Sequence, residues 1–243
     1  MVRVEKRMCG ASNGMINLRL IHNDAKPLQI LCLGAHSDDI EIGCGGTLLH
    51  LKAEGVPIEF HWVVISAAGI RGEEALKSAE LFTAGCKREI LLKEFRDGFL
   101  PYGGIQLKEF FEELKQRVSP DLIFTHWHGD AHQDHRMINE LTWNTFRNHF
   151  IMEYEIPKFD GDMGRPNAFV PLRDSERQQK IENLFAAFHS QLSKPWFAAE
   201  TFLGLMRLRG MESNAHSGYA EAFYTRKVVV DFVARDRHTR EQP

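Results

Sequence analysis

Hydrophobic and polar positions follow two alternating patterns along residues 28–157. Short, almost wholly apolar runs predict buried strands, and stretches with apolar residues three or four apart predict helices. The predicted strands are 28–34, 58–66, 89–95, 121–126 and 151–157. The helices predicted between them are 43–54, 73–85, 106–118 and 134–148. This alternation is typical of βαβ units, so we expect an α/β fold: a Rossmann-like three-layer sandwich with a mainly parallel sheet and helices on both faces.

The rest of the chain is less regular. Residues 1–27 show no periodicity and are expected to form an N-terminal tail, followed by a single domain over 28–233 and a C-terminal tail over 234–243. Within the domain, the turn-forming residues of 160–171 predict a loop or short strands. The later patterns predict helices over 173–190 and 196–209 and a last strand over 227–233.

Composition narrows the class of protein. The chain has 243 residues, of which 43% are hydrophobic and 26% charged, as in a soluble globular protein. A net charge of −3 argues against a dedicated nucleic-acid binder. No run reaches the roughly 18 to 20 apolar residues that cross a bilayer, and no apolar core of a signal peptide is found. The four scattered cysteines predict no disulfide framework, so a cytoplasmic location is expected.

The first chemical motif is AHSDDIEIGCGGTL, residues 35–48, after the first predicted strand. It places His36 beside two adjacent carboxylates, a donor set that suits a catalytic Zn²⁺. Consecutive residues point in different directions, so one of Asp38 and Asp39 can bind the metal while the other takes a proton from water. Helix capping by both aspartates is the alternative for this motif alone. Its glycines permit close approach of a ligand or another backbone, and they do not match the dinucleotide pattern G-x-G-x-x-G.

The second motif is THWHGDAHQDHR, residues 125–136, after the fourth predicted strand. The carboxyl ends of parallel strands meet at one rim, so this motif should lie beside the first one and beside residues 66–73. Four histidines and two aspartates at that rim predict a metal site. One histidine can complete a His/Asp/His triad with His36 and Asp39, and another can act as an acid or stabilise an oxyanion.

Together these motifs resemble those of a known family. AHSDDIEIGCGGT is similar to the signature A-H-P-D-D-E/D-x-x-x-G-x-G-G-T of the LmbE-like, or PIG-L, zinc-dependent de-N-acetylases. HQDHR resembles the family's H-x-D-H-R, and AEAF at 220–223 resembles its C-terminal motif. Ser37 stands where proline is usual and Ile40 where an acid is usual, and neither is an expected ligand.

The resemblance implies the roles of the motif residues. It implies that His36, Asp39 and His135 bind one Zn²⁺ and that Asp38 is the general base. It also implies that a protonated His132 stabilises the oxyanion or assists as an acid, with Asp134 as its charge partner.

Two further residues are expected to bind substrate. Arg71 matches a basic residue of the family that contacts substrate, and the alternative is a surface salt bridge with Glu73 or Glu74. Tyr219 could donate to the oxyanion or to a sugar hydroxyl, and the alternative is packing near the end of the domain.

The expected function is that of a zinc-dependent N-deacetylase, a hydrolase that removes an acetyl group from an N-acetylated small molecule. The residues predict a metal hydrolase, and only the resemblance supplies the acetamide and an amino sugar such as N-acetylglucosamine or a glycoconjugate. An amidase of thiol conjugates or of another small amide would use the same site. A non-catalytic, Rossmann-like nucleotide-binding module is the alternative of another class and would hold no stoichiometric zinc. The sequence leaves open the sugar, a possible homo-oligomer and the roles of His126, His128 and His216.

Overall fold

The computed structural model describes residues 2–4, 18–20 and 26–230. The predicted C-terminal tail and most of the predicted N-terminal tail lie outside these residues, so the division of the chain into tails and one domain stays a prediction. Near the N-terminus, β1 (Val2–Val4) pairs antiparallel with β2 (Leu18–Leu20), where the sequence predicted no regular structure. Among the described residues, no helix combines the length and the apolar character that crossing a membrane requires.

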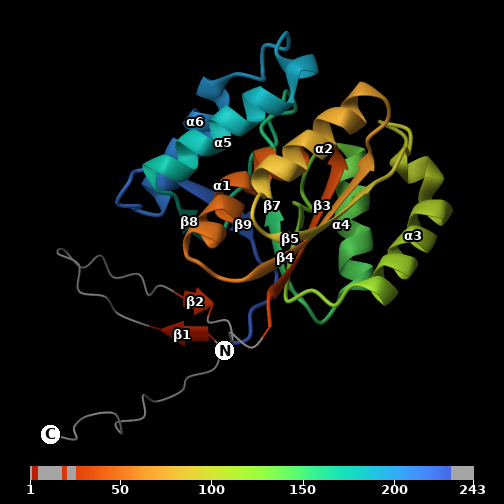
Figure 1. Cartoon of the computed structure of the whole chain (residues 1–243), viewed down its shortest axis with the longest axis horizontal. Coiled ribbons are helices and arrows are strands. Elements are labelled where there is room, and N and C mark those ends of the chain that lie inside the picture. The colour runs from red at the N-terminus through yellow and green to blue at the C-terminus, as the bar shows by residue number, and fades with distance from the viewer. Residues whose placement is uncertain (1, 5–17, 21–25, 231–243) are drawn as a thin grey trace, which may run out of the picture.

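A seven-stranded sheet with the order β5-β4-β3-β6-β7-β9-β8 forms the middle of the molecule (Figure 1). The parallel strands are β3 (Leu28–His36), β4 (Ile58–Ser66), β5 (Lys87–Leu92), β6 (Leu122–His126) and β7 (Phe150–Tyr154). At one edge, β9 (Ala220–Tyr224) runs antiparallel to both β7 and β8 (Ala168–Pro171). The mainly parallel α/β sheet predicted from the sequence is confirmed.

The prediction of the last strand is wrong. Residues 227–230 form no strand, and 231–233 lie outside the described residues. Side chains explain the difference: Val229 is 90% exposed, whereas every residue of β9 is buried between β7 and β8. The apolar run at 227–233 was the stronger sequence signal, because Glu221 argues against a buried strand unless its charge has a partner. The short strand β8 falls within 160–171, where a loop or short strands were expected.

Helices cover both faces of the sheet. One face carries α1 (Asp39–Ala53), α2 (Ile70–Phe82), α5 (Asp174–Ala187) and α6 (Ala199–Glu212), and the other carries α3 (Gly104–Arg117) and α4 (Gln133–Thr145) (Figure 1). Along β3, Ile30 and Cys32 pack into the first core, while Leu31 and Leu33 pack into the second. Burial on both faces explains why the strands read as continuous apolar runs.

The direction in which the chain adds strands reverses between β3 and β6. β4 and β5 lie on one side of β3, and β6 and β7 lie on the other. The connections that leave β3 and β6 therefore diverge, which is where ligands bind in sheets of this type. His36 is the last residue of β3 and His126 the last of β6, so the topology brings the two sequence motifs together.

Candidate metal centre

The three expected metal ligands converge at the switch point between β3 and β6. His36 Nδ1 lies 3.2 Å from His135 Nε2 and 3.4 Å from Asp39 Oδ2. His135 Nε2 lies 3.5 Å from Asp39 Oδ1. Asp39 opens α1, and its Oδ2 accepts a hydrogen bond of 2.6 Å from the His36 backbone N–H, which fixes the carboxylate toward the strand end.

These distances fit a small cation. Ligands about 2.0 to 2.1 Å from a tetrahedral Zn²⁺ lie about 3.3 Å from one another, close to the three separations found here. His36 and His135 form a compact donor group with His132, and Asp39 and His135 form another with His126. Two imidazoles and one carboxylate leave a tetrahedral position open, as a catalytic zinc site requires.

Carboxylates behind the two histidines fix their tautomers. His135 Nδ1–H donates to Asp130 Oδ2 over 2.9 Å, and His36 Nε2–H faces Asp97 Oδ1 at 3.1 Å. Each ring therefore turns the lone pair of its other nitrogen toward the triad. Two lone pairs and a carboxylate that face one another repel unless a proton or a metal ion lies between them, which supports the fit of a cation.

Charge at the triad is shared between these groups. Burial alone would lower the pKa of His36, but Asp39 and hydrogen bonds to Asp134 and Asp97 raise it well above its ordinary value. Burial would raise the pKa of Asp39, but His135 and its histidine neighbours hold that pKa well below its usual range. The carboxylate is thus kept ionised, as a metal ligand must be.

The charge of Asp134 opposes the lowering of the pKa of His132 by burial, but the hydrogen bonds that the structure gives for its carboxylate go to other groups. Its Oδ2 lies 3.3 Å from His36 Nε2 and accepts a hydrogen bond of 2.7 Å from the Gly98 N–H. Its Oδ1 accepts from the Leu100 N–H at the start of the short helix η1 (Leu100–Gly103). A buried carboxylate needs hydrogen-bond donors, and here His36 and the backbone of the loop after β5 supply them. Asp134 therefore ties that loop to the triad.

His132 caps α4 and stacks against His135, with ring centroids 4.6 Å apart. Its Nδ1 accepts a hydrogen bond from the Asp134 backbone N–H, so in the neutral ring the proton is on Nε2. Burial and the positive charges of His135 and His36 lower the pKa of His132. The neutral ring is therefore favoured, in contrast to the protonated form expected from the sequence.

Asp38 is buried at the N-terminus of α1, where it precedes the first helical residue. Its Oδ1 accepts a 2.8 Å hydrogen bond from Arg71 Nη2, and its Oδ2 has no hydrogen-bond partner among the described residues. Burial raises the pKa of Asp38, and the Arg71 guanidinium opposes that rise. One oxygen is thus held and the other is free to receive a proton.

Arg71 forms two ion pairs, one of them with Glu74 as the alternative interpretation expected. Its Nη1 donates to Glu74 Oε2 over 2.9 Å, which is one of the salt bridges considered, while its Nη2 reaches Asp38. Glu74 is itself buried and accepts from the backbone N–H and hydroxyl of Ser190, in the short helix η2 (His189–Gln191). Arg71 is therefore fixed beside the triad.

Tyr219 is placed by packing. Its ring lies under the guanidinium of Arg177, at 4.2 Å, and near that of Arg207, at 5.7 Å. None of the contacts that the structure gives for its side chain is with a residue of the triad, which favours the packing alternative. His216 is exposed, and His128 pairs with Glu153 at 3.0 Å.

His126 is the site residue whose place the sequence could not predict. Its ring is fully buried and stacks on His135, with centroids 3.9 Å apart. Its Nε2 accepts from the Ala35 N–H over 3.0 Å and lies 3.1 Å from Asp39 Oδ2. Burial and His135 lower the pKa of His126 to about 4, so this ring stays neutral and supports His135.

The glycines of the first motif leave room for side chains from other elements to pack against α1. A Cβ at Gly43 would lie 2.2 Å from the Tyr154 ring, and one at Gly45 would lie 2.6 Å from the Phe82 ring. A Cβ at Gly46 would meet Leu172 and the carboxylate of Glu221. The expected close approach to α1 is thus made by neighbouring side chains.

Known proteins share the sequence around this site. Residues 31–146 match the model of the PIG-L family, which is described as GlcNAc-PI de-N-acetylase. The chain is also 28% identical over 157 residues to the uncharacterized deacetylase YaiS of Escherichia coli strain K12. That similarity covers 59% of this chain and 82% of YaiS.

Solved structures share the fold at low sequence identity. The N,N'-diacetylchitobiose deacetylase of Pyrococcus horikoshii has a TM-score of 0.61 at 23% identity, over 81% of this chain and 83% of that one. The 4-carboxy-2-hydroxymuconate hydratase GalB of Pseudomonas putida KT2440 has a TM-score of 0.61 at 18% identity, over 85% and 100%. Similarity of the whole fold therefore does not fix the reaction. The match over residues 31–146 spans both the His36 and the His135 motifs, so this part of the chain is similar to the PIG-L, or LmbE-like, family.

Proposed function

We propose that this chain is a zinc-dependent hydrolase that removes the acetyl group of an N-acetylated amino sugar or glycoconjugate. The observation that carries the proposal is the convergence of His36, Asp39 and His135, with separations of 3.2 to 3.5 Å, on the rim that also holds Asp38. The description of the family and the names of YaiS and of the chitobiose deacetylase support an acetamide as the bond that is cleaved.

His36 Nδ1, His135 Nε2 and the carboxylate of Asp39 would hold the metal. When bound, Zn²⁺ supplies a Lewis acid that lowers the pKa of a water molecule and polarises an amide carbonyl. Asp130 and Asp97, which accept from the outer nitrogens of the two histidines, keep both rings aimed at that position.

Asp38 would carry the proton transfers. Its free Oδ2 accepts the proton of the attacking water, while Arg71 holds Oδ1 and prevents rotation of the carboxylate. Burial raises the pKa of Asp38, which makes its carboxylate a stronger base toward the water proton. It returns the proton to the amine that leaves.

His132 would donate a hydrogen bond to the oxyanion from its neutral Nε2–H. This donor is set in advance, because the helix-capping hydrogen bond to Nδ1 fixes the tautomer. A neutral donor needs no proton from solvent at the moment of reaction. The substrate contact expected of Arg71 stays a prediction, and that of Tyr219 is not carried into this proposal.

Acetate release, followed by mass spectrometry, tests the function. The panel contains N-acetyl sugars, nucleotide sugars and glycoconjugates, with thiol conjugates and small amides to detect the alternative amidase. We expect zinc at about one ion per chain and acetate release from at least one N-acetylated sugar. Release from thiol conjugates alone would favour the amidase, and a protein that binds no zinc and cleaves no amide would refute the proposal.

A further inference from the structure

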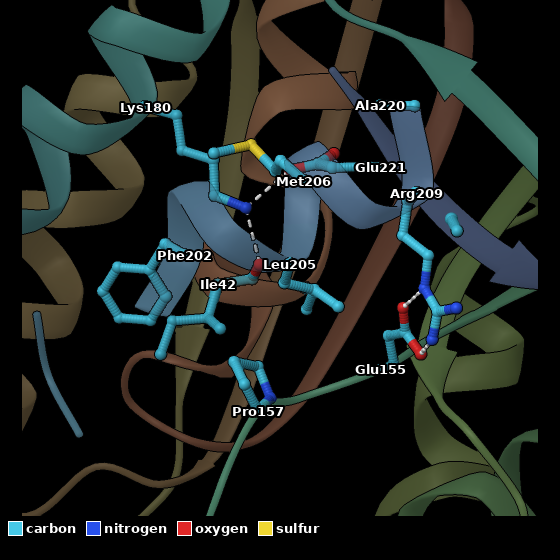
Figure 2. A pocket seen from close by; sticks show the side chains of 12 residues that line it. Ile42, Glu155, Pro157, Lys180, Phe202, Leu205, Met206, Arg209, Ala220 and Glu221 are labelled. Carbon is cyan, nitrogen blue, oxygen red and sulfur yellow. Dashed lines mark hydrogen bonds and ion pairs between the residues drawn. The ribbon is translucent and has the colours of Figure 1, made fainter. Parts of the chain in front are cut away.

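A buried ion pair lies beside α1. Lys180 of α5 and Glu221 of β9 are 2% and 4% exposed, and Lys180 Nζ lies 2.6 Å from Glu221 Oε1 (Figure 2). Removing two charges from water is costly unless further hydrogen bonds satisfy them. In this pair, the further partners are backbone groups of α1.

The ion pair forms hydrogen bonds with both ends of one turn of α1. Lys180 Nζ donates to the Ile42 carbonyl over 2.6 Å, as the dashed lines in Figure 2 show. Glu221 accepts from the N–H groups of Gly46 and Thr47 over 2.8 and 2.6 Å. Ile42 and Gly46 are four residues apart, the spacing of one hydrogen bond of a regular helix. A cation thus meets a carbonyl and an anion meets N–H groups, the favourable orientation for each charge.

This turn leads directly to the base and the metal ligand. The Ile42 N–H donates to the Asp38 carbonyl over 3.1 Å, so one residue connects Lys180 to Asp38. Asp39 is the next residue and the first of α1. The absence of a side chain at Gly46 lets the Glu221 carboxylate approach α1, because a Cβ there would lie 2.9 Å from Glu221 Oε1.

We propose that Lys180 and Glu221 are positioning residues, which hold the turn of α1 from Ile42 to Gly46 and thereby the orientation of Asp38 and Asp39 just before it. They touch neither substrate nor metal. The proposal rests on the proposed function, since it concerns how that site is aligned. Misplacement of a reacting group by about 1 Å can cost about 100-fold in rate, so a device that fixes this turn affects catalysis.

Glu221→Gln is the test, and Glu155→Gln is its control. Glu155 forms another buried ion pair, with Arg209 at 2.6 Å, and its hydrogen bonds to Arg209 do not involve α1 (Figure 2). Zn²⁺ affinity is measured by titration of metal-free protein, with kcat, KM and Tm measured alongside. We expect E221Q to lose about 10- to 100-fold in Zn²⁺ affinity, as supporting partners of metal ligands do, and to lower kcat more than KM. We expect E155Q to stay within about 2-fold at a similar change in Tm.

A double variant covers the case in which E221Q does not fold. Lys180→Met with Glu221→Gln removes both charges and leaves no unpaired ion, a change that is often tolerated. If either folded variant keeps the Zn²⁺ affinity and kcat of E155Q, the positioning role is overturned while the function stands. If the wild type neither binds Zn²⁺ nor releases acetate, the proposed function fails, and the positioning role fails with it.

Discussion

The substitution Asp38→Asn separates proton transfer from metal binding. The introduced asparagine can keep its oxygen on Arg71 and place its amide nitrogen where the free Oδ2 lies, so the local geometry is retained. Asp39 keeps its contacts with His36 and His135, so zinc should remain bound. The variant lacks only the oxygen that would receive the proton.

The size of the effect follows from the surroundings of that oxygen. General-base transfer contributes about 10²- to 10⁴-fold, which is about 2.7 to 5.4 kcal/mol of transition-state stabilisation. We expect the upper part of this range, because the other carboxylates of the cluster are engaged. Asp39, Asp130 and Asp134 all accept hydrogen bonds from histidines or backbone N–H groups in the described structure.

The assay compares kcat, bound zinc and the pH profile of D38N with those of the wild type. The pKa of Asp38 is raised by burial, so the wild type should lose activity as the pH falls and this carboxylate becomes protonated. D38N should lack that acidic limb. Asp174→Asn, at an exposed carboxylate of α5, makes the same chemical change away from the site and should have no effect. Loss of zinc in D38N, or a kcat near that of the wild type, would refute the assignment of Asp38 as base.

Other substitutions test the remaining parts of the site. His135→Ala removes one of three ligands, and zinc analysis of the purified variant should show little bound metal; full occupancy would disprove the triad. Asp130→Asn weakens the support of the His135 ring, so titration should give an affinity for zinc about 10- to 100-fold lower, with unchanged affinity counting against that role. Gly43→Ala drives a methyl group into the Tyr154 ring and should cost about 1 to 3 kcal/mol, or about 2 to 4 °C in Tm per kcal/mol. In the control Gly204→Ala, the new methyl group lies more than 4 Å from every described atom outside its own stretch of helix, so this change should not lower Tm.

Sequence patterns predicted most of the parallel sheet because each of its strands is a run of apolar residues buried on both faces. They also predicted which residues meet at the rim, because the carboxyl ends of neighbouring strands fix that position. The partners of individual side chains could not be predicted as well from the sequence. The Asp134 carboxylate forms hydrogen bonds with His36 and with the loop after β5. Two of these bonds depend on backbone donors 34 to 36 residues away.

Two further differences have the same origin. His126 is fully buried beside Asp39. Its place in the sequence, next to the end of a strand, does not reveal that burial. The place of β9 could not be predicted, because the charge of Glu221 is balanced by Lys180 from a distant helix. Long-range partners of charged groups leave no local signal in the sequence.

The order of strands in the sheet also sets when the site can be completed during synthesis. His135 follows His36 by 99 residues, and Glu221 follows Gly46 by 175. At about 5 to 20 residues per second, the second motif emerges roughly 5 to 20 seconds after the first. Until then the nascent chain holds only His36 and Asp39 of the proposed triad, and contacts between such distant residues form slowly. We therefore expect zinc to be loaded late, after β6 has joined β3, so that the ion follows the folding of the sheet and does not direct it.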